Sequence, residues 1–329
     1  MTDNGVLVHC EATGDRLAAI ATEVLGAGRH LALELGKSLS AVLIGCNMGS
    51  AAREAIAYGA DRVYVIDNPL FKDYLTDLYM QAMEKVINEE NPGIVLLGQT
   101  RIGQDLTPRL AFRMNTAAVM DCIALSIDHD SKRMLMTKPV YGGNAQSLQV
   151  CETDPQLATI RSKALSPAEK DTDHEGEIVN IDADSYQECI RTRVLNRQIE
   201  AAHGVKLEDA GVVVTGGRGI GGAEGFKELE ELAGIFKGAI GASRPACDNK
   251  WVSDNIQVGL TGRIVSPDLY IAVGVSGSSQ HLSGCSGSKV IVAINKDPDA
   301  NIFNVARYGI IADWKKVLPA FTARVRELI

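Results

Sequence analysis

The chain has 329 residues, of which 46% are hydrophobic and 22% are charged, a balance typical of a globular protein with about two domains. Its net charge of −8 argues against a sequence-independent nucleic-acid binder, which needs a basic face. No stretch approaches the ~20 apolar residues of a membrane span. The amino terminus, MTDNGVLVHC, lacks the basic region of a signal or transit peptide.

The apolar pattern of the first half predicts a doubly wound α/β domain. Short apolar runs bounded by turn residues alternate with helical patterns, such as that of residues 73–88. Apolar strands separated by helices are typical of a parallel sheet covered on both faces. The expected strands lie at residues 5–10, 39–45, 62–67, 93–98, 122–128, 134–140 and 157–161.

Residues 164–185 are rich in Asp and Glu and show almost no apolar periodicity, so we expect an exposed connection there. A second α/β series follows, and we therefore predict an N-terminal domain of residues 1–204 and a C-terminal domain of residues 205–329. Its expected strands are 212–215, 239–242, 269–274, 290–295 and 308–312, and its expected helices are 224–237, 279–282, 301–306 and 314–328.

Seven cysteines are spread along the chain, and no two of them form a C-x-x-C pair. Zinc and iron–sulfur sites usually show such pairs, so we expect no metal. Free, buried thiols in a reducing cytoplasm are the simpler interpretation. The cysteines are Cys10, Cys46, Cys122, Cys151, Cys189, Cys247 and Cys285.

The stretch VVVTGGRGIGG contains a G-x-G-x-x-G pattern at Gly217, Gly219 and Gly222. An NAD site needs an acidic residue about 20 positions later, at the end of the second strand. Here that strand ends in Ser243 and Arg244. An arginine at this position leaves NADP open, and a tight strand-to-helix turn also accounts for the glycines without any ligand.

Three further loops rich in glycine and hydroxyl groups adjoin the predicted strands, at residues 257–262, 274–281 and 293–297. In a parallel sheet such loops meet at the carboxyl edge, where backbone N–H groups bind phosphates. Arg218, Arg244 and Lys296 add positive charge. Together these loops predict a site for a long ligand such as a dinucleotide.

These loops resemble those of the electron transfer flavoprotein α subunit. The similarity extends from VVVTGGRG through GASR, QVGLTGRIVSPDLYIAVGVSGSSQHLSG and VIVAINKDPDANIF to YGIIADW. In the first domain, GQTRIGQDLTPRL resembles the family's G-x-T-x-x-G-R-D-L-x-P-R-L segment, with Gln104 where arginine is usual. The resemblance covers nearly the whole chain.

The resemblance implies an electron carrier in the prokaryotic cytoplasm. The chain would pair with a β subunit and hold one FAD mainly in its C-terminal domain. The flavin would pass electrons one at a time between a dehydrogenase, such as an acyl-CoA dehydrogenase, and an acceptor. The implied folds are adenine-nucleotide-hydrolase-like for the first domain and deoxyhypusine-synthase-like for the parallel-sheet FAD-binding domain.

The family's FAD contacts, carried over by motif, predict the site residues. Arg244 and His281 would stabilise negative charge on the reduced flavin, and the Thr261 hydroxyl would donate toward its N5 atom. The predicted cofactor-binding residues are Arg218, Ser243, Arg244, Gln257, Val258, Gly259, Leu260, Thr261, Ser276, Gly277, Ser278, Ser279, Gln280, His281, Asn295, Asp313 and Trp314.

Some positions depart from the family, and two other functions stay open. Leu260 stands where many relatives have glutamine, and Cys247 and Cys285 lie in segments that differ from the usual ones. A bifurcating complex with a second FAD in the β subunit is one alternative, and an NADP-dependent oxidoreductase is another. In the first domain, Asp105 and Arg109 have the spacing of a helical ion pair rather than of a catalytic site.

Overall fold

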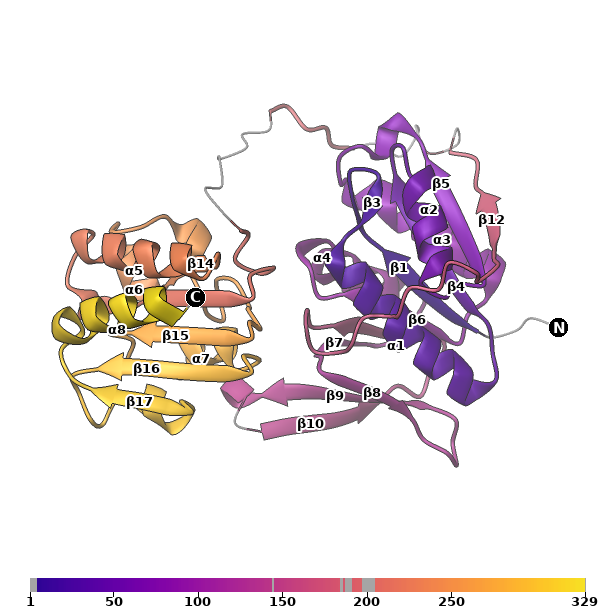
Figure 1. Cartoon of the computed structure of the whole chain (residues 1–329). Coiled ribbons are helices and arrows are strands. Elements are labelled where there is room, and N and C mark those ends of the chain that lie inside the picture. The colour runs from indigo at the N-terminus through magenta and orange to yellow at the C-terminus, as the bar shows by residue number, and fades with distance from the viewer. Residues whose placement is uncertain (1–4, 144, 184–185, 187–190, 197–204, 329) are drawn as a thin grey trace. The chain divides into compact units, whose positions relative to one another are not determined.

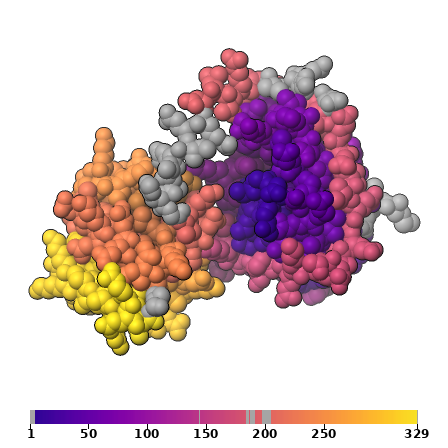
Figure 2. All heavy atoms as spheres, turned by 45° about the horizontal axis from the view of Figure 1, so that its top comes forward, coloured from indigo at the N-terminus to yellow at the C-terminus, as the bar shows by residue number. Residues whose placement is uncertain are grey.

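The computed structural model describes residues 5–143, 145–183, 186, 191–196 and 205–328. The chain forms two compact units, of which the first comprises Met1–Pro139 and Gln146–Gln198 and the second Val140–Ala145 and Ile199–Ile329 (Figure 1). The expected domain boundary at residues 204 and 205 touches residues 197–204, which lie outside the described part, so its position stays a prediction. Figure 2 shows one face of the two units with all heavy atoms drawn, the first unit mainly in indigo to magenta and the second mainly in orange to yellow.

The first unit contains a seven-stranded sheet in the order β12-β5-β4-β1-β6-β11-β7. Every pairing is parallel, and Val6 lies opposite Leu39 on one side and Ile94 on the other. The strands are β1 (Val6–Cys10), β4 (Leu39–Gly45), β5 (Arg62–Asp67), β6 (Ile94–Gly98), β7 (Ala118–Cys122), β11 (Gln156–Ile160) and β12 (Glu177–Asn180).

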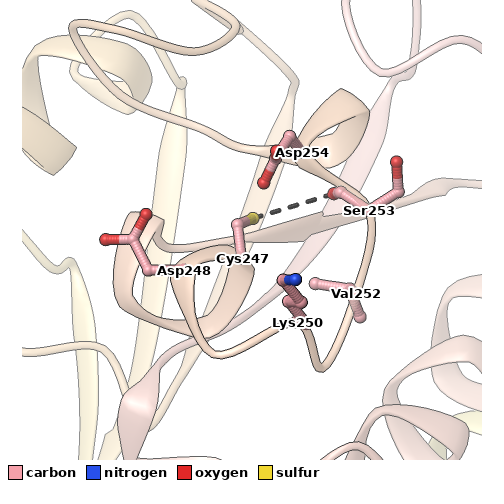
Figure 3. A pocket seen from close by; sticks show the side chains of 6 residues that line it. All are labelled: Cys247, Asp248, Lys250, Val252, Ser253 and Asp254. Atoms are coloured by element: carbon pink, nitrogen blue, oxygen red, sulfur yellow. Dashed lines mark hydrogen bonds between the residues drawn. The ribbon is translucent and has the colours of Figure 1, made fainter.

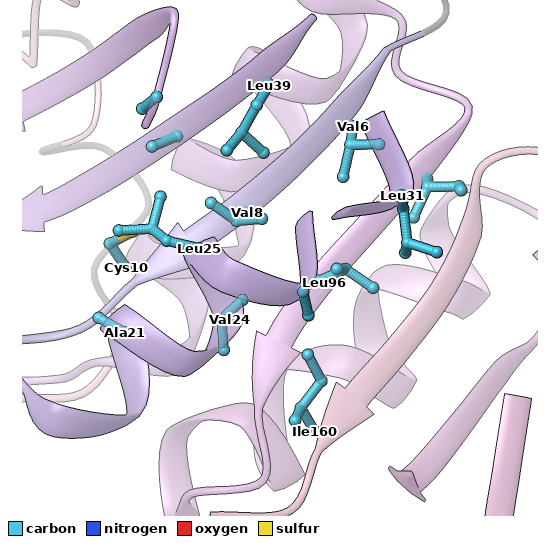
Figure 4. Close-up of a cluster of buried hydrophobic side chains, with 14 of the residues drawn as sticks. Val6, Val8, Cys10, Ala21, Val24, Leu25, Leu31, Leu39, Leu96 and Ile160 are labelled. Atoms are coloured by element: carbon cyan, nitrogen blue, oxygen red, sulfur yellow. The ribbon is translucent and has the colours of Figure 1, made fainter. Parts of the chain in front are cut away.

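Helices cover both faces of this sheet because alternate strand residues point to opposite sides. In β1, Val6 and Val8 pack with Val24 and Leu25 (Figure 4), whereas Leu7 belongs to the cluster on the other face. The doubly wound α/β prediction is therefore confirmed. The helices are α1 (Ala19–Leu35), α2 (Gly49–Ala57), α3 (Thr76–Glu90) and α4 (Arg101–Arg113), with the short 3-10 helix η1 (Pro69–Phe71).

Smaller strands lie outside the main sheet. They are the hairpin β2 (Ala12–Thr13) and β3 (Arg16–Leu17), and a second sheet of β8 (Ala124–Ile127), β9 (Met134–Val140) and β10 (Ala145–Val150), with η2 (Tyr141–Gly143) between the last two.

The strand expected at residues 122–128 corresponds to the shorter β8, whereas β7, which precedes it in the main sheet, was not expected. Asp121 adopts a φ of 67° and its carboxylate accepts two hydrogen bonds from Arg161, at 2.9 and 2.6 Å. This left-handed residue lies one position before the end of β7, where the pairing with β11 shifts register, and β8 then begins in a different sheet.

The described residues of the segment 164–185 are largely exposed, as expected, but the segment is more than a connection. Residues 177–180 form β12, which pairs in parallel with β5 at the edge of the sheet. Glu177 accepts a hydrogen bond from Arg62 at 3.0 Å, and Ala183 is buried. An edge strand pairs with a neighbour on one side only. The sequence of β12, EIVN, is too short to show an alternation that would predict a strand.

The second unit contains five parallel strands in the order β14-β13-β15-β16-β17. Its strands are β13 (Val212–Gly216), β14 (Ala239–Ala242), β15 (Leu269–Val273), β16 (Val290–Asn295) and β17 (Tyr308–Ile311). Its helices are α5 (Glu224–Ile235), α6 (Arg244–Asp248), α7 (Ser279–Cys285) and α8 (Trp314–Leu328), and its 3-10 helices are η4 (Arg218–Ile220), η5 (Asp254–Ile256) and η6 (Asn301–Asn304).

Two apolar clusters bury the faces of this second sheet. Phe226 of α5 and Leu318 of α8 pack on one side with Val214, while Leu282 of α7 and Ile302 of η6 pack on the other. The expected helix at residues 301–306 is only the short 3-10 helix η6, and α7 runs three residues further than expected. A two-domain α/β protein built on parallel sheets is confirmed.

Thr100 and Gly103 of the GQTRIG motif are needed for the first turn of α4. Thr100 caps the helix by accepting from the Gly103 N–H at 3.1 Å, and a Cβ on Gly103 would lie 1.9 Å from the Gly98 carbonyl oxygen. We predict that Gly103→Ala destabilises the first unit by about 2 kcal/mol or more.

Hydrogen–deuterium exchange of peptides spanning residues 94–113 measures this loss in the first unit alone. Gly49→Ala is the matched control, because a Cβ there meets no atom within 4 Å, and it changes protection by less than about 0.5 kcal/mol. Equal protection of the two variants would contradict the packing argument.

Candidate functional site

The carboxyl ends of the five strands of the second unit meet at one edge because all their pairings are parallel. The loop after β13 carries Arg218, and Ser243 follows β14. The loop after β15 leads into α7, and Asn295 and Asp313 lie at or just beyond the ends of β16 and β17. The structure thus brings the predicted site segments to one edge.

The first two glycines of the G-x-G-x-x-G pattern are needed for packing between loops. The Gly219 N–H donates to the Gly274 carbonyl at 3.0 Å, and a Cβ on Gly217 would lie 2.1 Å from the same oxygen. Gly274 itself has a φ of 62°. A Cβ on Gly222, by contrast, meets no atom within 4 Å. The pattern therefore records a close contact between two backbones, and the Arg218 side chain at its centre is exposed.

Trp314 holds the last loop against the first one. Its side chain is buried in the core beside α5, and its indole N–H donates to the Gly219 carbonyl at 3.2 Å. Asp313 is exposed, and its carboxylate accepts from the Lys315 N–H at 3.1 Å. The structure gives Trp314 a positioning role, while cofactor contacts of Asp313 and Trp314 stay predictions.

The loop after β14 combines a buried serine with an exposed arginine. The Ser243 N–H donates to the Gly216 carbonyl at 2.9 Å, yet its buried Oγ atom makes no hydrogen bond within the described residues. Arg244 begins α6, and its largely exposed side chain lies 3.5 Å from the equally exposed Asp248. Such a surface pair is weak, so the guanidinium is available to an anionic ligand.

Residues 257–262 form a bridge from β14 to α7. The Val258 N–H donates to the Ala242 carbonyl, and the Leu260 N–H donates to the Gln280 carbonyl, both at 2.8 Å. Gly259 has a φ of 147°, and the Gln257 side chain donates to the Thr261 hydroxyl at 3.0 Å. Val258 is buried, so only its backbone can reach a ligand, whereas Leu260 and Thr261 are exposed.

The loop before α7 is fixed from two sides. The Ile302 N–H donates to the Ser276 carbonyl at 3.1 Å, and a Cβ on Gly277, whose φ is 78°, would lie 2.2 Å from the Ile302 nitrogen. The Asn295 side chain donates to the Val275 carbonyl at 2.9 Å. Exposed polar side chains then line the start of the helix: Ser276, Ser278, Ser279 and Gln280.

His281 differs from these neighbours because it is buried, with 5% of its surface exposed. Its Nε2 atom lies 2.9 Å from the Tyr270 hydroxyl, and its Nδ1 atom makes no hydrogen bond within the described residues. Burial disfavours the charged imidazolium and lowers the pKa of His281 to about 4. The ring is therefore neutral at neutral pH, so the predicted role of His281 at the ligand becomes that of a hydrogen-bond donor, whereas Arg244 offers a charge.

An open depression of about 470 Å³ lies between α6 and η5 (Figure 3). Its Cys247 is buried, its Sγ atom lies 3.7 Å from the Ser253 carbonyl, and burial raises the pKa of its thiol to about 11. Burial likewise raises the pKa of Cys285 to about 12. Both thiols are unreactive core groups. The depression is lined by Cys247, Asp248, Lys250, Val252, Ser253 and Asp254.

The described residues contain neither a cluster of three metal-ligating side chains nor a helix long and apolar enough to cross a membrane.

A parallel sheet whose carboxyl edge carries glycine and serine loops, exposed arginines and unpaired buried polar atoms defines a nucleotide-cofactor-binding α/β protein. The model of the electron transfer flavoprotein domain matches residues 6–186, and that of the electron transfer flavoprotein FAD-binding domain matches residues 206–286. The chain belongs to the electron transfer flavoprotein α subunit family, and FAD is the cofactor of its second unit.

Full-length relatives agree with this assignment. The chain is 42% identical to the electron transfer flavoprotein subunit alpha of Thermoanaerobacterium thermosaccharolyticum and 43% identical to that of Bacillus subtilis, over 98% of every chain. It is 34% identical to the acryloyl-CoA reductase electron transfer subunit beta of Anaerotignum propionicum, over 98% of this chain and 95% of that one.

The residues at the edge fit FAD. Ser243 Oγ and His281 Nδ1 are buried polar atoms without a hydrogen bond in the described part of the chain, and such atoms are costly unless a ligand or water pairs with them. Arg218 and Arg244 are exposed cations at the same edge, where a pyrophosphate or a reduced flavin carries negative charge. Leu260 is exposed and apolar, so the departure from glutamine removes a polar group but no packing.

The sequence did not predict the supporting role of Tyr270 and Gly274. Tyr270 lies in the apolar strand β15, which is almost fully buried. The only feature of the sequence that could have indicated its role is that a buried tyrosine hydroxyl needs a hydrogen-bond partner. The contact of Gly274 with Gly219 joins residues 55 positions apart, which spacing alone cannot reveal.

We predict that Arg244→Ala lowers the reduction potential of the bound flavin. Loss of one exposed charge at about 4 Å removes about 1 kcal/mol, or ~40 mV for one electron. Spectroelectrochemical titration measures the shift. Arg324→Ala is the matched control, because Arg324 is about as exposed as Arg244 and pairs with an acidic residue of its own helix, Glu327. Equal potentials in the two variants would place Arg244 away from the ring.

Acid should weaken the second unit through His281. Its pKa is 6.5 when unfolded and about 4 when folded, so the unfolded state takes up the proton first. The resulting loss of stability is absent above pH 6.5, grows as the pH falls toward 4, and reaches at most ~3 kcal/mol. His281→Asn flattens this dependence.

Both tryptophans, Trp251 and Trp314, lie in the second unit, so tryptophan fluorescence during urea unfolding at several pH values reports that unit alone. A variant of the exposed His30, His30→Gln, should keep the wild-type pH profile. A profile of His281→Asn identical to the wild type would show that His281 titrates normally.

Proposed function

We propose that this chain is the FAD-carrying α subunit of a heterodimeric electron transfer flavoprotein in the cytoplasm of a prokaryote. It would take electrons from a dehydrogenase and pass them singly to an acceptor. The observation that carries this proposal is the set of loops at one sheet edge, which combines the family's FAD-binding motifs with exposed arginines and a neutral buried histidine.

The side chains at this edge bind and tune rather than react. Arg218 and Arg244 attract negative charge, the Gln257 side chain orients the Thr261 hydroxyl, and His281 offers a neutral donor. FAD, once bound, supplies the redox chemistry. Electron transfer requires no proton-transfer group and no nucleophile from the protein. A site that only binds and tunes the flavin is therefore sufficient for an electron carrier.

An acyl-CoA dehydrogenase is the partner that the similarities favour. The Anaerotignum propionicum relative is named as an electron transfer subunit of acryloyl-CoA reductase, an enzyme of a CoA thioester. A partner that handles an acyl-CoA therefore fits this chain, together with a β subunit that completes the heterodimer.

Flavin analysis of the chain co-expressed with its β subunit tests the proposal. We expect one FAD per heterodimer, reduced by an acyl-CoA dehydrogenase and its substrate and not by NADPH. Two FAD per heterodimer with reduction by NADH would instead indicate the bifurcating form. A colourless complex that binds NADPH would overturn both flavin functions.

A further inference from the structure

We propose that Tyr270 is a positioning residue of the FAD site. Its hydroxyl donates to Nε2 of His281 and so keeps the imidazole proton on Nδ1, which leaves Nδ1–H as a donor for the cofactor. The inference rests on the proposed function because it needs FAD at this edge of the sheet.

The two rings are held by different elements of the second unit. Tyr270 lies in β15 and is fully buried, and His281 lies in the first turn of α7. The hydroxyl and Nε2 are 2.9 Å apart, and the ring centroids are 6.2 Å apart with the planes tilted by 55°. Packing of α7 allows little adjustment, because a Cβ on Gly284 would lie 2.3 Å from the Gly259 nitrogen.

The direction of this hydrogen bond follows from the groups around the hydroxyl. Burial raises the pKa of Tyr270 well above its ordinary value, with smaller effects of Cys285 and Thr215 beside it, so the phenol keeps its one proton. A thiol and a hydroxyl are weaker acceptors than an imidazole nitrogen, and both can donate to the phenol oxygen. The Tyr270 proton therefore goes to Nε2.

The tautomer of His281 follows from this hydrogen bond and from the neutral state of the ring. Because burial lowers its pKa to about 4, the ring is neutral, and a neutral ring that accepts at Nε2 carries its proton on Nδ1. That nitrogen is buried and makes no hydrogen bond to any described residue. The Val258 backbone lies near enough to the ring to oppose part of the lowering of the His281 pKa, so the ring lies beside the loop of residues 257–262, whose members are predicted to bind FAD.

The imidazole ¹⁵N chemical shifts of the histidine-labelled chain in the FAD-loaded heterodimer test the proposal directly. We expect a protonated Nδ1 and an unprotonated Nε2 for His281, and a mixture of tautomers in Tyr270→Phe. His9, which is buried with an unpaired Nδ1 in the first unit, should not respond. A protonated Nε2 in the wild-type protein would overturn the proposal, and this result needs no variant to fold.

Affinity for FAD supplies the second readout. Loss of one buried hydrogen bond weakens binding about three- to tenfold, so we expect this increase in Kd for Tyr270→Phe. Tyr79→Phe is the matched control, because Tyr79 is also buried but donates to the Ile44 carbonyl in the first unit.

A double-variant test separates tautomer control from packing. The amide nitrogen of asparagine can replace Nδ1, whereas that of glutamine replaces Nε2, so His281→Asn should bind FAD more tightly than His281→Gln. In the His281→Asn background, Tyr270→Phe should change the Kd by less than about twofold. An unchanged tenfold loss there would show that Tyr270 acts through packing. Absence of FAD from every variant and from the wild type would instead contradict the proposed function.

Discussion

The close contact between Gly274 and the loop after β13 is the constraint on which the site depends. The Gly274 carbonyl accepts from the Gly219 N–H and lies where a side chain on Gly217 would be. The indole N–H of Trp314 donates to the carbonyl of Gly219 itself. Three loops from three strands thus meet at backbone groups of the loop after β13, and the side chain of Arg218 stays exposed at the surface.

Burial divides the polar groups of the edge into two kinds. Ser243 and His281 are held inside by backbone contacts and stay neutral, whereas Arg218 and Arg244 lie in solvent and keep their charge. Neutral buried donors give directional hydrogen bonds without the cost of burying a charge, and exposed arginines act at longer range. A carrier that holds one cofactor through several redox states benefits from both.

The sequence predicted most strands of both sheets because fully buried parallel strands are continuous apolar runs. It did not predict β7, which is only partly buried, or β12, whose short sequence pairs with β5 at the edge of the sheet. The strand break near Asp121 depends on a positive φ and on Arg161, 40 positions away. The motifs placed the site loops correctly at one edge, but the inward direction of Trp314 and the Tyr270–His281 contact arise from tertiary packing that no local pattern records.

The first unit carries a different kind of group at the carboxyl edge of its own parallel sheet. At the carboxyl edge of its sheet, Glu11 follows β1 and accepts a hydrogen bond from Thr100, the residue that caps α4. Burial raises the pKa of Glu11, and Thr100 opposes that shift by stabilising the carboxylate. A carboxyl group therefore occupies the helix terminus that would otherwise attract phosphate. The loops at the carboxyl edge of the second unit carry glycine, serine and arginine instead, so the two edges differ in charge as well as in strand order.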